Sequence, residues 1–120
     1  MTQNYIGTKI VLAWSQEKDG QSGYGVKYAD GYTSWSPTAA FEAAYLPIGN
    51  VSHLPDYQQR VIGERAELND KIAKLDSFTN TSRFAEIDSG DQSLLREQLT
   101  HMRAYAAVLN ARIEGFDLPL

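Results

Sequence analysis

A run of apolar residues in the last third of the chain recurs at alternating intervals of four and three positions. Its members are Leu95, Leu99, Met102, Ala106, Leu109, Ile113 and Phe116. This period is typical of a helix that packs lengthwise against another helix. The pattern therefore predicts a helix from about Gly90 to Glu114, with Gly115 as its C-terminal cap.

A second long helix is predicted over residues 55–78. Its apolar positions are Leu54, Val61, Leu68, Ile72 and Leu75, interrupted by Gln58 and Arg65. Residues 79–90 are polar without a regular pattern, and Ser89 with Gln92 resembles a capping box for the last helix. Two long helices with so short a connection are expected to form an antiparallel hairpin. Because such a hairpin buries little apolar surface alone, another copy of the chain is expected to complete its core.

The first 36 residues are rich in β-branched and aromatic positions, which favour strands. Three strands are expected to form a small antiparallel sheet, within the runs 5–14, 23–28 and 32–35. Residues 15–22 form a polar connection between the first two strands. Between the last two, Asp30-Gly31 predicts a type I′ turn, in which both central residues have positive φ.

Ser36-Pro37 predicts the start of a short helix, because serine caps exposed N–H groups and proline fits the first helical position. This helix is expected to run from Pro37 to Tyr45. The predicted fold class is therefore α+β, with a small N-terminal antiparallel sheet and a short helix over residues 1–50. A long antiparallel two-helix hairpin that oligomerises follows over residues 51–120, and the two parts are expected to make one compact domain.

Composition narrows the classes of function. The chain has no cysteine, which excludes disulfides and thiolate metal sites and fits a reducing compartment. No signal peptide is expected after Met1, and no run approaches the roughly 20 apolar residues of a membrane span. The net charge of −4 argues against a surface that binds long nucleic acid, but it leaves room for a small anion in a local basic pocket.

Residues that form catalytic centres are not grouped in this sequence. Nucleophile-elbow, P-loop and dinucleotide-binding motifs are missing, and the glycines of residues 20–25 precede a predicted strand with the wrong spacing to hold phosphate. His53 and His101 lie in different predicted elements without further ligands nearby. We therefore expect no enzyme activity, no metal and no cofactor.

A polar, partly cationic line runs beside the apolar positions of the last helix. Arg96, Thr100 and Arg103 recur at helical spacing, and Asn110 continues the line. Arginine presents a planar fork of donors that suits phosphate oxygens, and threonine adds a hydroxyl. Taken alone, the spacing favours ordinary surface charges, with Arg96 and Arg103 paired to Glu97 or to the facing helix.

Arg60 and Arg112 form a second candidate anion site. An antiparallel hairpin brings the start of its first helix and the end of its last helix to the same end. Again, solvated surface charge is the commoner outcome. Asn80 and Phe84 lie in the predicted connection, where a phenylalanine either packs on the hairpin or stacks on a base, and packing is the commoner arrangement.

Several short motifs resemble two groups of phage counter-defence proteins. In the hairpin these are residues 54–61, 67–72, 95–99 and 102–105. They resemble the helical hairpin domain shared by the first type of anti-Thoeris protein and the second type of anti-CBASS protein. Residues 6–9 and 31–37 resemble the sheet extension of the anti-Thoeris group.

The resemblance implies a sponge, a protein that binds cyclic nucleotide signals of bacterial immunity and holds them without cleaving them. The anti-Thoeris group sequesters glycocyclic ADP-ribose isomers, and the anti-CBASS group sequesters cyclic dinucleotides and cyclic trinucleotides. Members assemble as dimers and hexamers. For this chain, the resemblance implies these ligands and a homo-oligomer, expected to be a hexamer built from dimers, in the host bacterial cytoplasm. No membrane or long nucleic acid is expected as a partner.

The resemblance also assigns residues to ligands. Arg96 and Thr100 match the arginine and threonine, four positions apart, of the cyclic trinucleotide site, where a threefold axis lets each copy meet one phosphate. The candidates for the ADP-ribose pocket are Arg60, Arg112, Phe84 and Asn80. No residue is assigned to a cyclic dinucleotide site. The alternative hypothesis is an oligomerisation or adaptor module that has no small-molecule ligand.

Overall fold

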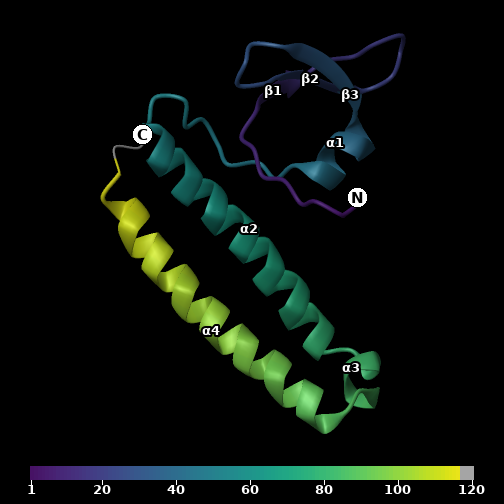
Figure 1. Ribbon diagram of the computed structural model, residues 1–120, viewed down its shortest axis with the longest axis vertical. Coiled ribbons are helices and arrows are strands. Elements are labelled where there is room, and N and C mark those ends of the chain that lie inside the picture. The colour runs from purple at the N-terminus through teal and green to yellow at the C-terminus, as the bar shows by residue number, and fades with distance from the viewer. Residues whose placement is uncertain (117–120) are drawn as a thin grey trace. The chain divides into compact units, whose positions relative to one another are not determined.

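The computed structural model describes residues 1–116. The chain forms two compact units, Met1–Leu46 and a second that begins at Pro47 (Figure 1). A three-stranded antiparallel sheet with a short helix makes the first unit, and a long helical hairpin makes most of the second. The predicted α+β class is therefore confirmed.

The sheet consists of β1 (Leu12–Ser15), β2 (Gly23–Lys27) and β3 (Thr33–Pro37), in that order. Both neighbouring pairs are antiparallel. The first strand is shorter than predicted, because Leu12 already pairs with Lys27, the last residue of β2, and residues 5–11 have no strand beside them. Trp14 pairs with Gly25, where a Cβ would overlap the indole ring. Only glycine therefore lets the indole lie against the sheet at this position.

A type I′ turn joins the first two strands, where the sequence predicted only a polar connection. Lys18 and Gln21 exchange two backbone hydrogen bonds of 2.9 Å. Both residues between them have positive φ, 51° at Asp19 and 79° at Gly20. This is the geometry of a two-residue hairpin loop.

The type I′ turn predicted at Asp30-Gly31 is wrong. Only Gly31 has a positive φ there, 91°, and its N–H donates to the carbonyl of Tyr28 at 2.9 Å. These features define a type I turn followed by a left-handed glycine. The loop is longer because Tyr28 and Tyr32 pair across three residues, whereas the first connection closes across two.

Helix α1 (Thr38–Ala44) packs on one face of the sheet. The ring of Phe41 stacks on Tyr24 of β2, with 4.3 Å between ring centroids, and on Tyr45 at 4.8 Å. Val26 lies on the same side of β2 as Tyr24 and is 1% exposed. These side chains form the small core of the first unit.

The start of α1 differs from the prediction in one respect. Ser36 does not cap the helix, because Ser36 and Pro37 belong to β3. Pro37 is the N-cap residue and makes no side-chain capping bond, and the Thr38 N–H donates to the carbonyl of Ser22 at 3.3 Å. Tyr45 is the C-cap, as the prediction placed the end of the helix.

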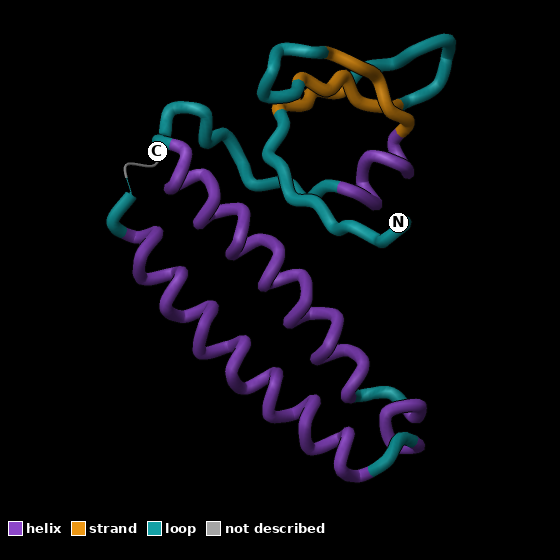
Figure 2. The backbone as a smooth tube through the Cα atoms, viewed as in Figure 1, coloured by secondary structure: helices purple, strands orange, loops and turns teal. Residues whose placement is uncertain are grey.

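Helices α2 (Asp56–Thr79) and α4 (Ser89–Glu114) lie side by side and antiparallel, as Figure 2 shows in purple. Their contact is the core of the second unit, and the apolar period predicted it. The core consists of Val51, Leu54, Val61, Ile62, Leu68, Ala106, Leu109 and Ile113, with Met102 and Phe116 packed against it. Leu109 is completely buried. No helix in the described part is long and apolar enough to cross a bilayer.

A short helix, α3 (Ser82–Glu86), interrupts the connection that the sequence predicted to be irregular. The hydroxyl oxygen of Thr81 accepts a hydrogen bond from the Phe84 N–H at 3.2 Å and caps its start. At its other end, the side-chain amide of Gln92 donates to three carbonyls, those of Phe84 at 3.1 Å, Ala85 at 3.3 Å and Ile87 at 3.0 Å. Side chains therefore hold both ends of α3.

The predicted capping box at Ser89 is wrong. Asp88 is the N-cap of α4, and its carboxylate accepts a hydrogen bond from the Gly90 N–H at 2.9 Å. The amide of Gln92 turns instead to the carbonyls that end α3. Gly115 caps the C-terminus of α4 as predicted.

Candidate anion-binding site on the helical hairpin

Arg96 is an exposed residue on the first half of α4, and its guanidinium lies over an aromatic ring. The guanidinium carbon Cζ is 4.9 Å from the centre of the Phe84 ring, within the range of a cation–π contact. Phe84 itself is 2% exposed and meets Phe78 edge to face, with 5.7 Å between centroids. Within residues 1–116, no carboxylate forms an ion pair with Arg96. Its positive charge is therefore oriented but not neutralised.

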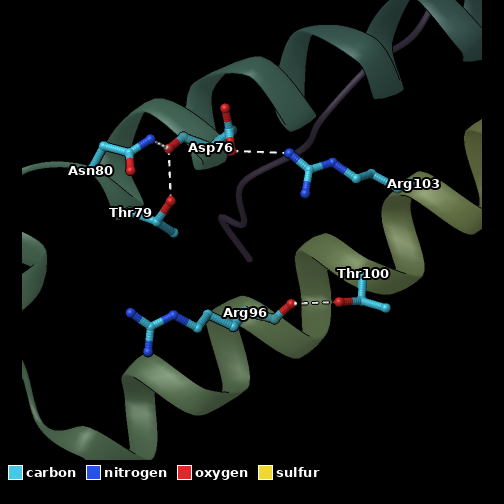
Figure 3. Close-up of polar contacts among 6 residues, drawn as sticks. All are labelled: Asp76, Thr79, Asn80, Arg96, Thr100 and Arg103. Atoms are coloured by element: carbon cyan, nitrogen blue, oxygen red, sulfur yellow. Dashed lines mark hydrogen bonds and ion pairs between the residues drawn. The ribbon is translucent and has the colours of Figure 1, made fainter.

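Arg103 has a different environment, although it lies on the same helix. Its Nη2 atom is 3.0 Å from Oδ1 of Asp76 on α2, and about half of each side chain is exposed (Figure 3). This is the pairing with the facing helix that the spacing alone favoured. The carboxylate of Asp76 matches the charge of Arg103, so this arginine links the two helices.

Thr100 is exposed on α4, one turn after Arg96. Its hydroxyl donates to the carbonyl of Arg96 at 3.1 Å, a common bond for threonine in a helix. Figure 3 shows that the two side chains leave α4 in different directions. A shared backbone carbonyl links the two residues, and their polar ends do not meet within one chain.

Asn80 is the C-cap residue of α2. Its side-chain amide donates to the carbonyl of Asp76 at 3.0 Å, and the hydroxyl of Thr79 donates to the same carbonyl at 2.7 Å. Asp76 is therefore bonded through both its backbone and its carboxylate, the latter to Arg103 (Figure 3). This cluster stabilises the end of α2 beside α3.

Arg60 and Arg112 lie at the other end of the hairpin, on α2 and α4 respectively. A hydrogen bond of 3.3 Å from Arg65 to Asn110 joins the two helices near this end. Both arginines are exposed, and neither forms an ion pair with another described residue. At 1.5 Å per helical residue, α2 separates Arg60 from Asn80 by about 30 Å. A single chain thus places Arg60 and Arg112 at the same end of the hairpin, away from Asn80.

Three further residues shape the site, and sequence reasoning did not identify their roles. Gln92 secures α3, Phe78 supports the ring of Phe84, and Asp76 pairs with Arg103. The spacing of Ser89 and Gln92 predicts a cap at the start of α4, but the Gln92 side chain bonds to the end of α3. His101 lies 3.6 Å from Glu97 on the outer face of α4, a surface pair when the imidazole is protonated. Among residues 1–116, no group of three or more metal-binding side chains is close enough to hold an ion.

The fold and the site together define a class of protein, a helical hairpin with exposed arginines at both of its ends. These arginines have no carboxylate partners among the described residues. Residues 55–115 match the family model described as Sequestin. The chain therefore belongs to the Sequestin family, the family of phage anti-Thoeris and anti-CBASS sponges. The resemblance seen in the sequence of the hairpin is confirmed.

A small phage protein is also similar to this chain. It is described as an uncharacterised 7.5 kDa protein in the denB-rIIB intergenic region of Enterobacteria phage T4. The two are 37% identical over 60 residues, which cover 50% of this chain and 94% of the phage protein. No solved structure matches the chain.

Proposed function

We propose that this protein is a phage counter-defence sponge that binds cyclic nucleotide immune signals and holds them intact. The environment of Arg96 supports this proposal most: its side chain is exposed, lies over Phe84 and pairs with no carboxylate among residues 1–116. Such a fork of donors suits phosphate oxygens. Membership of a family of binding sponges supports the same conclusion. The site of action is the host bacterial cytoplasm.

Arg96 and Thr100 are the proposed contacts for a cyclic trinucleotide. Three copies arranged about a shared axis place one arginine and one threonine at each phosphate, and the two side chains at one phosphate need not come from the same copy. The Thr100 hydroxyl first leaves the Arg96 carbonyl, to which it donates at 3.1 Å. This rotation costs little, because a hydroxyl proton rotates freely and the phosphate replaces the lost acceptor. Arg103 can contact a phosphate of the ligand only if that phosphate displaces the carboxylate of Asp76.

Arg60 and Arg112 are the proposed anion contacts of a second pocket, for a glycocyclic ADP-ribose. Asn80 and Phe84 lie at the opposite end of the same hairpin. A pocket that includes all four residues therefore needs two copies, each offering a different end. A cyclic dinucleotide is a third possible ligand class, without assigned residues.

The outer face of α4 supports an assembly of copies. Large apolar side chains are exposed there, with exposed fractions of 63% at Leu94, 43% at Tyr105 and 57% at Val108. A second chain would remove this surface from water. We propose a homo-oligomer, a hexamer built from dimers.

Titration of the purified protein with cyclic ADP-ribose isomers and with cyclic trinucleotides tests the proposal. After calorimetric titration, the complex is heat-denatured and the released ligand is identified by mass spectrometry. We expect tight binding and release of the intact ligand. Lack of binding to both ligand classes would favour the adaptor hypothesis, and a cleaved ligand would identify an enzyme.

A further inference from the structure

One aromatic ring lies directly under the proposed phosphate-binding arginine. Phe84 is 2% exposed, so its ring is not available to stack on a base without a rearrangement of the loop. Its neighbours are the edge of Phe78, at 5.7 Å between centroids, and the guanidinium of Arg96, at 4.9 Å. At this end of the hairpin, the ring therefore contacts Arg96 and is not exposed to a ligand.

The position of this ring depends on α3, a helix of five residues. A helix this short is not stable in water by itself. The Thr81 hydroxyl caps its first turn, and the Gln92 amide takes up three carbonyls at its end. Gln92 lies on α4, one turn before Arg96. The helix that carries the arginine thus also holds the loop that supports it.

Arg96 and Arg103, two of the three arginines of this helix, show what an aromatic support achieves. Asp76 orients Arg103 and cancels its charge. Phe84 restrains Arg96 and leaves the charge available. A restrained guanidinium loses less conformational entropy when it binds a phosphate, and an unpaired one has no carboxylate to displace.

We propose that Phe84 is the positioning residue of the Arg96 site and that Gln92 secures it, an inference that rests on the proposed function. The ring fixes the guanidinium on the α3 end of α4. The amide of Gln92 keeps the ring in place through the carbonyls of α3. Neither residue touches the trinucleotide at this site, and each acts through Arg96.

The binding test uses the full chain and cyclic triadenylate as the probe. Phe84→Leu keeps an apolar side chain but removes the aromatic face. We expect its affinity to fall about two- to thirtyfold for each copy of Arg96 at the ligand, because an arginine that the ring does not restrain loses more side-chain entropy on binding. Leu68→Ala is the control for a general loss of core packing, since Leu68 lies in the hairpin core and not at α3. A folded Phe84→Leu protein that binds as tightly as the wild type would overturn the inference, as would equal losses in both variants.

Nuclear magnetic resonance tests the geometry without any ligand. The ring current of Phe84 should shift the Arg96 Nε proton upfield in the wild type but not in Phe84→Leu. The corresponding proton of Arg103 serves as the control and should not move. Gln92→Leu, which removes the amide donors, should reduce the Arg96 shift and weaken binding in the same direction. If Gln92→Leu changes neither, Gln92 does not secure the ring.

The two measurements separate the two proposals. Wild-type protein that does not bind any cyclic nucleotide would refute the proposed function, even with the Arg96 proton shifted. An Arg96 proton without an upfield shift in the wild type would refute the positioning role of Phe84, even with tight binding. A shifted proton together with weaker binding in Phe84→Leu alone supports both.

Discussion

Removal of Arg96 should weaken ligand binding with little effect on stability. In the wild type, its guanidinium is exposed and has no carboxylate partner among the described residues. The matched control is the double variant Asp76→Ala with Arg103→Ala, which removes an ion pair of 3.0 Å without a change in net charge. Arg96→Ala instead removes one positive charge from each copy.

The expected size of the binding effect follows from the proposed arrangement around a threefold axis. A hydrogen bond to a charged group contributes about 1.5–3 kcal/mol, so three copies of Arg96 contribute about 5–9 kcal/mol to one ligand. This amounts to a loss of more than about a thousandfold in Kd for a cyclic trinucleotide. The double variant should bind within about threefold of the wild type, a free-energy difference of less than about 0.7 kcal/mol.

The effects on folding should be small and similar in the two proteins. Arg96→Ala loses an exposed cation–π contact with Phe84, which contributes about 0.5–1 kcal/mol. The double variant loses an exposed ion pair between Asp76 and Arg103, which contributes about 0.2–1 kcal/mol. Unequal binding therefore cannot come from unequal stability.

Calorimetric titration with a cyclic trinucleotide and with a glycocyclic ADP-ribose measures both proposed sites, and thermal unfolding checks the fold. Arg96→Ala should abolish trinucleotide binding and leave ADP-ribose binding intact. An equal loss of both ligands would refute the assignment of two separate sites. Trinucleotide binding that survives Arg96→Ala but fails in the double variant would show that Arg103 is the phosphate contact.

Three further predictions concern packing and hydrogen bonding inside each of the two units. Leu109→Ala should lower the free energy of unfolding by about 2–5 kcal/mol, because Leu109 is completely buried; a loss under about 1 kcal/mol in denaturant titration would contradict its central place in the core. Gly25→Ala should displace the indole of Trp14 and shift the tryptophan fluorescence to longer wavelength, and an unchanged spectrum would argue against the close contact. The hydrogen bond from Tyr24 to Glu42 raises the pKa of the phenol above its ordinary value of 10.0, so Glu42→Gln should move the ionisation seen by ultraviolet absorbance back towards that value. Because the folded pKa of Tyr24 is the higher one, its contribution to stability is complete below pH 10.0 and is lost as the pH rises through the raised value. The absence of any difference between the two proteins in alkaline titration would contradict the raised pKa of Tyr24.

The long helices could be predicted from the sequence because their signal is local. Residues three and four positions apart share one helix face, so the spacing from Leu95 to Phe116 already indicates which side is buried. Leu109 and Ile113 lie in the core as that spacing requires. The polar segment before Ser89 was short enough to place the two helices antiparallel.

The sheet shows where local signals are insufficient. Asp19-Gly20 and Asp30-Gly31 are the same dipeptide, yet only the first forms a type I′ turn. The number of residues between paired strand positions decides the turn, and this number depends on the register of the sheet. The length of β1 is likewise set by the end of its partner at Lys27 and not by the composition of residues 5–11.

The candidate site likewise has one part that the sequence predicts and one part that depends on the tertiary structure. The sequence alone determined that Arg96 and Arg103 share one line on a helix, and at that level the two arginines are equivalent. Tertiary structure separated them, because Asp76 of α2 lies opposite Arg103, whereas α3 brings Phe84 beneath Arg96. An ion pair neutralises the charge of Arg103, whereas the ring leaves Arg96 without a carboxylate partner in the described part of the chain. That difference arises from contacts between residues far apart in the chain, which the period of a single helix does not encode.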